Sequence, residues 1–304
     1  MNTTDGVGDL LKPLLDASLA SIIEEVCFST LSRVSASRLR ASAIPHIGQI
    51  ELVDSTAFQH EYSRLYTANF SGHEREHPSH ICERLEDQFA GRREGFAPYY
   101  IIGIRDADGT AIAAAQFSVL LPDSTRDVIP YLQYIYVRPQ NRAQLLSEVL
   151  HTLVLAVAVA VTFARRDDSQ LPHVPFTICE TQPEALERSK IHSKSGSQAL
   201  MLKRRADGRI LSAHIQPGLE PEDPPTTLVW LLRRCPGSES SSCSDELGRA
   251  LVAAYFDSLR EEGIPGKNVD EAESILEARY EQDCMFCQIP LSDVSRDMYV
   301  GIDP

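Results

Sequence analysis

The sequence has too few basic residues to balance its acidic ones. Of its 304 residues, 29 are Lys or Arg and 43 are Asp or Glu, which gives a formal net charge of -14 and a pI near 5.1. Nucleic acids and anionic membrane surfaces are bound through basic faces. The composition therefore argues against nucleic acid or membrane as the main partner, while a local basic pocket for a nucleotide remains compatible with it.

The cysteines lack the spacing of a disulfide framework. There are 7, an odd number at irregular intervals, which suits a reducing compartment. Cys284 and Cys287 form a lone C-x-x-C with no second pair at zinc-finger spacing, so packed thiols are favoured over a metal or redox site. Asp5 and Asp9 stand where an export signal would be basic. We expect a cytoplasmic protein, without metal.

No apolar run is long enough to cross a membrane comfortably. The longest extends from Val149 to Ala164, contains His151 and follows Glu148 directly. A transmembrane helix needs about 20 apolar residues. A helix that is apolar on all sides is more often buried inside a sizeable domain, and that is the prediction here.

The stretch from Ile129 to Arg166 organises the chain. The residues from Tyr131 to Val137 alternate as in a strand, and Pro139 ends it because proline has no N–H for a sheet. A long apolar helix is then predicted to open at Arg142. A strand that leads directly into a helix leaves unpaired N–H groups at the positive end of the helix dipole. This arrangement predicts a phosphate-binding turn.

Strand and helix patterns alternate on both sides of this stretch. Strands are expected over 49–53, 99–105, 110–121, 131–137, 174–180, 199–204, 209–215 and 226–234. Helices are expected around 58–65 and over 79–89, 142–164, 183–196, 245–262 and 270–282, with one or two more within 1–45.

Several segments resemble motifs of the GNAT superfamily of acyl-CoA-dependent N-acyltransferases. The stretch Tyr136–Arg142 is similar to the turn whose amides hold the pyrophosphate of coenzyme A, with matches at Val137, Pro139 and Arg142. Where the family prefers glycines, this chain has Ala143, Leu145 and Ser147. Weaker similarities lie in the segments ETQP at 180–183, IHSKSG at 191–196 and HIQP at 214–217.

The resemblance implies an α/β (α+β) fold with a mixed, mostly antiparallel central sheet flanked by helices. The GNAT-like domain would span 48–236, after an N-terminal helical extension over 1–47 and before a linker and C-terminal helices over 237–304. The N-terminal helices can cover a neighbouring surface or serve as a dimerisation arm, so a homodimer stays open. The C-terminal helices can pack on the main domain or on a partner protein.

The resemblance also implies a site for acetyl-CoA and an acceptor amine. A backbone N–H near Tyr134 would donate a hydrogen bond to the thioester carbonyl. His192 stands where the family often has a tyrosine that acts as the general acid. Glu180 is the candidate base, and Gln133 can orient the substrate. The implied coenzyme A contacts are Ile135, Val137, Arg142, Ala143, Gln144, Leu145, Leu146 and Ser147.

The segment from His73 to His77 matches the zinc-hydrolase pattern H-E-x-x-H. Its context argues against a metal site, because Pro78 disfavours a helical conformation at His77 and no apolar helix surrounds the motif. We favour an acceptor-binding loop, in which Glu74, Glu76 and His77 present an acidic rim to a cationic amine. The zinc hydrolase remains the weakest hypothesis.

Two other hypotheses remain. The first is an N-acyltransferase that moves an acetyl or other acyl group from coenzyme A to a primary amine of a small molecule or peptide. The second is a non-catalytic GNAT-like module that senses a ligand or binds a partner, suggested by the replaced glycines and by His192 in place of tyrosine.

Overall fold

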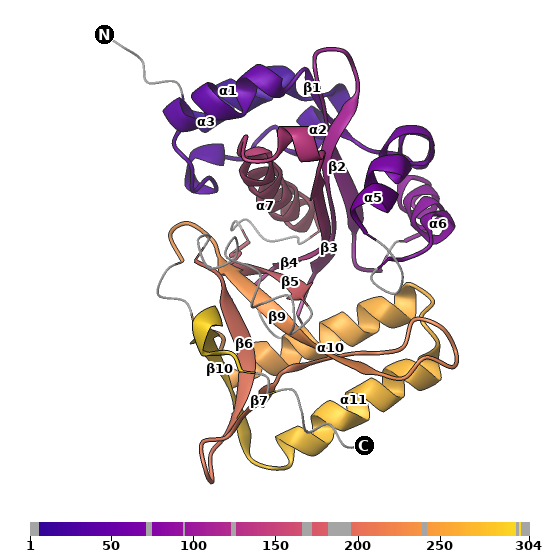
Figure 1. Cartoon of the computed structure of the whole chain (residues 1–304), viewed down its shortest axis with the longest axis vertical. Helices are drawn as coiled ribbons and strands as arrows, with labels where there is room; N and C mark the ends of the chain where they lie inside the picture. The colour runs from indigo at the N-terminus through magenta and orange to yellow at the C-terminus, as the bar shows by residue number, and fades with distance from the viewer. Residues whose placement is uncertain are drawn as a thin grey trace. The chain divides into compact units, whose positions relative to one another are not determined.

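The computed structural model describes residues 6–70, 75–93, 95–122, 126–165, 172–181, 196–238, 242–295 and 298 (Figure 1). The chain forms two compact units. The first unit comprises Met1–Val119 and Leu132–Val174, and the second Leu120–Tyr131 and Pro175–Pro304. Strand β4 (Ile129–Val137) supplies residues to both.

The first unit contains an antiparallel sheet in the order β1-β2-β3-β4. Besides β4, its strands are β1 (Gln49–Leu52), β2 (Tyr99–Arg105) and β3 (Ala111–Leu120). A tight turn joins β2 to β3, in which Gly109 takes a left-handed φ of 80° and its N–H donates to the carbonyl of Asp106. The strands predicted in this part of the chain all form, with ends shifted by at most two residues.

The N-terminal segment is broken into short helices, whereas one or two longer ones were expected. They are α1 (Val7–Leu11), α2 (Ala17–Ile22) and α3 (Ala36–Ser42), joined by the 3-10 turns Lys12–Leu14, Phe28–Thr30 and Ile44–His46. Asp16 explains one break, since its side chain accepts from the Leu19 N–H and caps α2. Asp16 also accepts from the Leu52 N–H, so this segment covers the edge of β1.

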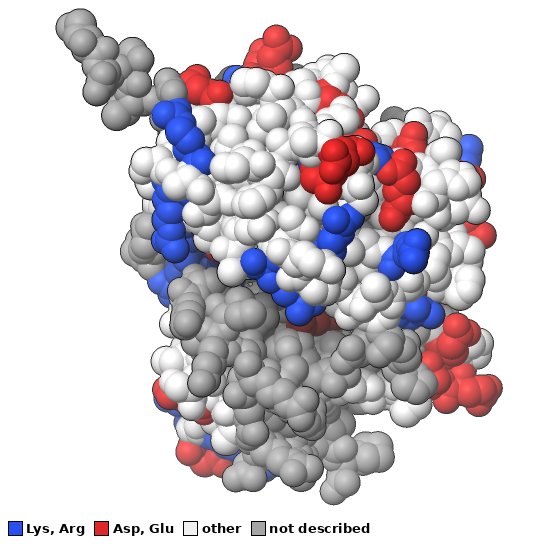
Figure 2. Space-filling model, turned by 45° about the horizontal axis from the view of Figure 1, so that its top comes forward, with Lys and Arg blue, Asp and Glu red and all other residues white. Residues whose placement is uncertain are grey.

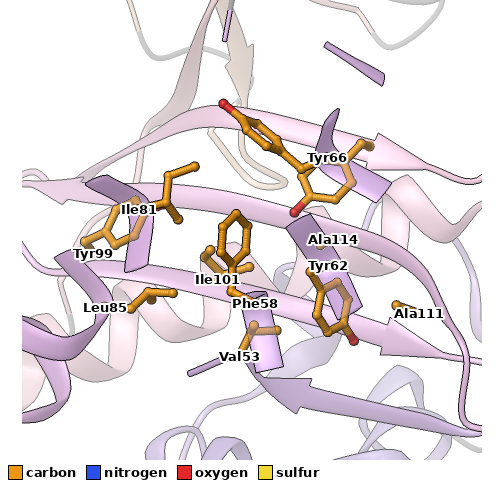
Figure 3. Close-up of a cluster of buried hydrophobic side chains, with 11 residues drawn as sticks. Val53, Phe58, Tyr62, Tyr66, Ile81, Leu85, Tyr99, Ile101, Ala111 and Ala114 are labelled. Atoms are coloured by element: carbon orange, nitrogen blue, oxygen red, sulfur yellow. The ribbon is translucent and has the colours of Figure 1, made fainter. Parts of the chain in front are cut away.

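Helices cover both faces of this sheet. On one side lie α4 (Ser55–Ala57), a π-helical turn (Phe58–Tyr62), α5 (Ser63–Asn69) and α6 (Pro78–Phe89). Figure 3 shows the core that they form with β2 and β3, in which the rings of Phe58, Tyr62 and Tyr66 lie over Ile101 and Ala114. Helix α7 (Leu146–Arg165) lies on the other side (Figure 1).

Helix α7 is the one helix, among the described residues, that is long and apolar enough to cross a membrane. Its residues are nevertheless largely enclosed by the protein, since 72% of its most apolar 18-residue stretch is buried. The predicted buried helix is therefore confirmed. Its start is corrected, because α7 begins at Leu146 and not at Arg142.

In the second unit, the first residues of β4 pair with β5, and the sheet then follows the order β5-β9-β6-β10. The strands are β5 (Phe176–Thr181), β6 (Gln198–Arg204), β7 (Ile210–Ser212), β8 (His214–Gln216), β9 (Thr226–Arg234) and β10 (Cys284–Pro290). Tyr131 pairs with Ile178 in parallel, while β5–β9, β9–β6 and β6–β10 are antiparallel. The predicted strand 209–215 is split at Ala213 into β7 and β8.

The C-terminal segment adds a strand as well as helices. Helices α10 (Asp245–Glu261) and α11 (Gly266–Tyr280) form as expected and lie side by side, and a 3-10 turn (Leu291–Asp293) follows β10. Strand β10 was missed. Gly248 of α10 packs directly on Phe286 of β10, where a Cβ would lie 2.4 Å from the ring.

The strand conformation of β10 also determines how the two cysteines of the C-x-x-C segment are oriented. Residues three apart on a strand point to opposite faces of the sheet. Cys284 and Cys287 therefore face away from each other, and all seven cysteines are free thiols.

Candidate functional site

The turn between β4 and α7 holds two non-glycine residues in the left-handed conformation. A 3-10 turn (Pro139–Asn141) follows β4, and then Ala143 and Leu145 adopt φ values of 67° and 59°. For residues other than glycine this conformation costs about 1–2 kcal/mol each. Such strain persists where the surrounding structure enforces it, and it gathers at ligand-binding sites.

The strained turn leaves a run of backbone donors available. The carbonyl of Leu145 accepts from the N–H groups of Glu148 and Val149, which starts α7. Among the described residues, no backbone carbonyl accepts a hydrogen bond from the N–H groups of 143–147. Consecutive amides of alternating hand form a concave anion-binding nest, and the dipole of a 20-residue helix adds positive potential.

The residues of the turn differ in their exposure to solvent. Ala143, Arg142 and Ser147 are exposed, while Leu146 is buried and anchors the start of α7. The Arg142 guanidinium donates to the Asn69 side chain at 3.2 Å. On the face shown in Figure 2, Lys and Arg side chains are scattered among Asp and Glu instead of forming one basic field.

A second polar group lies in the other unit, around Glu180 on β5. The Nε2 atom of His214 lies 2.8 Å from Glu180 Oε1, and the hydroxyls of Tyr131 and Tyr255 hydrogen-bond to the same carboxylate. The His214 ring stacks on Trp230 at 4.5 Å between centroids. The group draws on β4, β5, β8, β9 and α10.

The environment of Glu180 sets its charge. Burial by itself would raise the pKa of the carboxyl group, but His214 and the hydrogen bonds from Tyr131 and Tyr255 outweigh burial and hold the pKa below its ordinary value. The same burial and the nearby carboxylate raise the pKa of both tyrosine hydroxyls, so they stay protonated donors. Glu180 is therefore ionised at neutral pH.

Comparison by sequence identifies no relative. No family model matches the chain, and no curated protein matches it. Several solved structures are similar in fold. An N-acetyltransferase from Staphylococcus aureus Mu50 is 15% identical, with 61% of this chain and 96% of that chain covered and a TM-score of 0.35.

Two further structures have similar sequence identities and TM-scores. A GNAT superfamily phosphinothricin acetyltransferase from Sinorhizobium meliloti, in complex with AcCoA, is 11% identical over 64% of this chain and 91% of that chain, with a TM-score of 0.38. The ribosomal-protein-S18-alanine N-acetyltransferase from Escherichia coli is 14% identical over 62% and 93%, with a TM-score of 0.35. These values are too low to transfer any residue or substrate.

The order of the chain's own elements decides the fold. It runs β1, helices α4 to α6, strands β2 to β4, helix α7, strand β5 and then strands β6 to β9, with a parallel pair where β4 meets β5. Apart from the helix expected over 183–196, which lies outside the described residues, this is the order of strands and helices expected from the sequence. The fold is GNAT-like.

In this GNAT-like frame, the predicted coenzyme A contacts fall into two groups. Ile135 and Val137 lie half-buried on β4. The other six, Arg142 to Leu146 and Ser147, form the strained turn and the first residues of α7. Their proximity follows from their sequence positions, and their contact with coenzyme A stays a prediction.

The predicted acceptor loop is tied down by neighbouring side chains. The N–H of Glu76 donates to the Tyr134 hydroxyl at 3.3 Å, and the Tyr66 hydroxyl donates to the Glu76 carbonyl. The Glu76 carboxylate pairs with the buried guanidinium of Arg84. Glu76 therefore has a structural partner already, which lessens its availability to a substrate amine.

His77 has a local partner as well. Its backbone is extended, with φ -68° and ψ 132°, and its ring accepts from the Ser79 N–H as the N-cap of α6. It therefore does not lie on a helix with the rest of the H-E-x-x-H motif, as a zinc site of that type requires. His73 and Glu74 lie outside the described residues, and within the described part of the chain no group of three or more His, Cys, Asp or Glu could hold a metal ion.

The structure describes some of the predicted catalytic and substrate-orienting residues but not all of them. Tyr134 lies on β4, where its ring packs edge-on against Tyr66 and Phe70. Gln133 lies beside it, with its amide 3.4 Å from the Ser118 hydroxyl. His192, and the helix expected over 183–196, lie outside the described residues.

The surroundings of Glu180 could not be recognised from the sequence. His214 was noted only as part of the HIQP segment, and Tyr131 and Tyr255 only as strand and helix residues. These three residues lie 34 to 75 positions from Glu180 along the chain, so no spacing pattern connects them to it. The one available signal was a histidine within the predicted strand 209–215.

Proposed function

We propose that this protein is an N-acyltransferase that moves an acetyl or related acyl group from coenzyme A to a primary amine. The observation that carries the proposal is the turn after β4, where Ala143 and Leu145 hold the left-handed backbone that glycines favour. The replaced glycines were the main objection to a phosphate site. The left-handed backbone at these two positions supports a phosphate site although the glycines are replaced.

In this proposal the turn binds the pyrophosphate of acetyl-CoA through the N–H groups of 143–147. The amine nitrogen attacks the thioester carbonyl, a C–N bond forms, and the C–S bond breaks. The proton that the nitrogen loses ends on the departing thiolate, which makes coenzyme A a free thiol. Tyr134, Glu180 and His192 remain the candidate catalytic residues, and a small molecule or peptide would supply the amine.

Calorimetric titration with acetyl-CoA tests the proposal. Wild type should bind with micromolar affinity, and Ala143→Gly should bind at least as tightly because glycine adopts the left-handed conformation freely. Ala143→Val should lose about tenfold or more in affinity, since a β-branched residue resists that conformation. Absence of binding by wild type and Ala143→Gly at millimolar acetyl-CoA would refute the proposal.

Asp283 provides a matched control. It is the other described non-glycine residue with a left-handed φ, 56°, and it lies in the loop before β10. Asp283→Val should strain the backbone in the same way without changing acetyl-CoA binding. An equal loss of affinity in Asp283→Val and Ala143→Val would mean that the effect is one of general stability.

The second candidate function is a non-catalytic ligand-binding module. The same purified protein can distinguish this function from acyl transfer. The observation in its favour is the Glu76–Arg84 pair, which occupies a carboxylate predicted to meet the acceptor. Binding of acetyl-CoA without thiol release in the presence of a broad set of primary amines would favour this module. Release of coenzyme A thiol with any amine would exclude it.

A further inference from the structure

The guanidinium group of Arg142 is held by a residue that is distant in sequence. Its Nη2 atom donates to Oδ1 of Asn69 at 3.2 Å, across 73 positions of the chain. Asn69 is the last residue of α5, and Arg142 follows the 3-10 turn after β4. Both residues belong to the first unit. The contact therefore joins α5 to the turn that is proposed to bind phosphate.

The Asn69 side chain has an anchor of its own. Its Nδ2 atom donates to the carbonyl of Leu65, one turn back on α5, at 2.8 Å. An amide NH2 group donates and a guanidinium group cannot accept, so these two partners fix the amide with its oxygen toward Arg142. The acceptor for Arg142 is thus held in place before any ligand arrives.

The end of α5 is also a favourable place for a cation. Helix α4, the π-helical turn and α5 follow one another without a gap from Ser55 to Asn69. The carbonyl end of such a helical stretch carries partial negative charge, which attracts a cation near its last turn. Asn69 holds Arg142 at this end without bringing a full negative charge.

Arg142 differs in this respect from other arginines of the first unit. Three of them are paired with carboxylates: Arg84 with Glu76, Arg92 with Asp87, and Arg105 with both Glu51 and Glu61. Among the described residues, no carboxylate pairs with Arg142, and its side chain makes one hydrogen bond, to Asn69. The exposed guanidinium group therefore keeps its full charge and most of its five N–H donors for an anion.

We infer that Asn69 is a positioning residue, which holds the Arg142 guanidinium group beside the phosphate-binding turn with its charge uncompensated. This inference rests on the proposed function and extends its phosphate site from the turn to α5. A neutral amide restrains the long arginine side chain in advance, so less rotamer freedom is lost when an anion binds. A carboxylate at position 69 would restrain Arg142 as well, but it would also neutralise it.

Inorganic pyrophosphate tests the positioning role without coenzyme A. In amide NMR of the full chain at low ionic strength, sodium pyrophosphate should shift the signals of Ala143 and Leu145. Asn69→Ala should bind pyrophosphate about threefold more weakly, because the anion itself must then restrain the guanidinium group. Equal affinity of wild type and Asn69→Ala would overturn the inference.

Asn69→Asp tests whether the neutrality of the amide matters. The new carboxylate should pair with Arg142 and repel phosphate, so the affinity for pyrophosphate should fall about tenfold or more, further than in Asn69→Ala. High salt should narrow the gap between Asn69→Asp and wild type, because screening weakens interactions between exposed charges. Affinity in Asn69→Asp equal to that in Asn69→Ala would contradict the role of a neutral holder.

A double variant shows whether Asn69 acts through Arg142. The variant Asn69→Ala/Arg142→Ala should bind pyrophosphate no more weakly than Arg142→Ala alone, because the residue that Asn69 positions is already gone. If the losses of the two single variants instead multiplied in the double variant, Asn69 would act independently of Arg142 and the inference would fail.

Thr67→Ala is the matched control on α5. The Thr67 hydroxyl donates to the Arg64 carbonyl at 3.2 Å, so this variant removes a side-chain hydrogen bond from the same helix that does not involve Arg142. Its pyrophosphate affinity should equal that of wild type. An equal loss in Thr67→Ala and Asn69→Ala would trace the effect to the stability of α5 and overturn the inference.

Titration with acetyl-CoA separates this inference from the proposed function. Pyrophosphate binding that is weakened in Asn69→Ala, together with no binding of millimolar acetyl-CoA, would refute the proposed function and support the anion site. Equal acetyl-CoA affinity of wild type and Asn69→Ala would support the proposed function and overturn the inference. If wild type binds neither ligand, both fail.

Discussion

The turn after β4 and the group around Glu180 are built in opposite ways. The turn is contiguous in sequence, exposed and made of backbone, with its shape set by the φ values of Ala143 and Leu145. The Glu180 group is assembled from separate strands and a helix, is largely buried and is made of side chains. The first can be recognised from a short motif, and the second exists only after the sheet and α10 have come together.

This difference also predicts how much each region contributes to stability. A left-handed alanine costs about 1–2 kcal/mol of local strain, which glycine would relieve. Removing a partner of a buried ionised carboxylate costs about 1–3 kcal/mol or more, because the carboxylate is left without compensation. Variants in the Glu180 group should therefore destabilise the protein more than variants in the turn.

The largest effect is expected from His214→Asn. The variant leaves the Glu180 carboxylate without its imidazole partner, and the free energy of unfolding should fall by about 3 kcal/mol in urea denaturation. The double variant Glu180→Gln/His214→Asn should recover part of this loss because the unpaired charge is gone. A double variant no more stable than His214→Asn would show that the pair is not coupled.

The next effect concerns pH. The pKa of Glu180 is lowered in the folded protein, so the ionised carboxylate contributes stability above its unfolded pKa, about 4.3, and loses that contribution as pH falls through the folded value. The stability difference between wild type and Glu180→Gln should shrink as the pH falls below about 4. Urea denaturation at several pH values measures it, and a difference that grows on acidification would contradict the lowered pKa.

Smaller and opposite effects are expected in the turn. Ala143→Gly should raise the free energy of unfolding by about 1 kcal/mol, and Ala143→Val should lower it by about the same amount, because only the backbone preference changes at this exposed position. Thermal and urea denaturation give both values. If the two variants changed stability in the same direction, the left-handed conformation at Ala143 would be in doubt.

The smallest change in stability is expected from Arg142→Ala. Its guanidinium is exposed and makes one hydrogen bond to Asn69, so the free energy of unfolding should stay within about 0.5 kcal/mol of wild type. Affinity for acetyl-CoA should nevertheless fall about three- to tenfold at low ionic strength, and less at high salt because screening weakens a surface charge. An affinity loss independent of salt would argue against a phosphate contact.

Much of the fold could be predicted because its signals are local. The alternation in β2 and the apolar content of α7 report conformation within a few residues, and both elements were located with small errors at their ends. Strand β10 was missed, because Cys284–Pro290 carries no clear alternation and becomes a strand by pairing with β6. The start of α7 was misplaced, since the left-handed residues before it cannot be read from alanine and leucine.

The sequence by itself determined the order of elements, the position of the strand-to-helix turn and the identity of Glu180 as a notable carboxylate. These features depend on periodicity and on residues that are close together in the chain. Only the tertiary structure decided that Ala143 and Leu145 take the left-handed backbone and that Glu180 meets His214, Tyr131 and Tyr255. Backbone strain and side-chain convergence depend on what the rest of the fold packs against, and that packing joins residues that are distant in sequence.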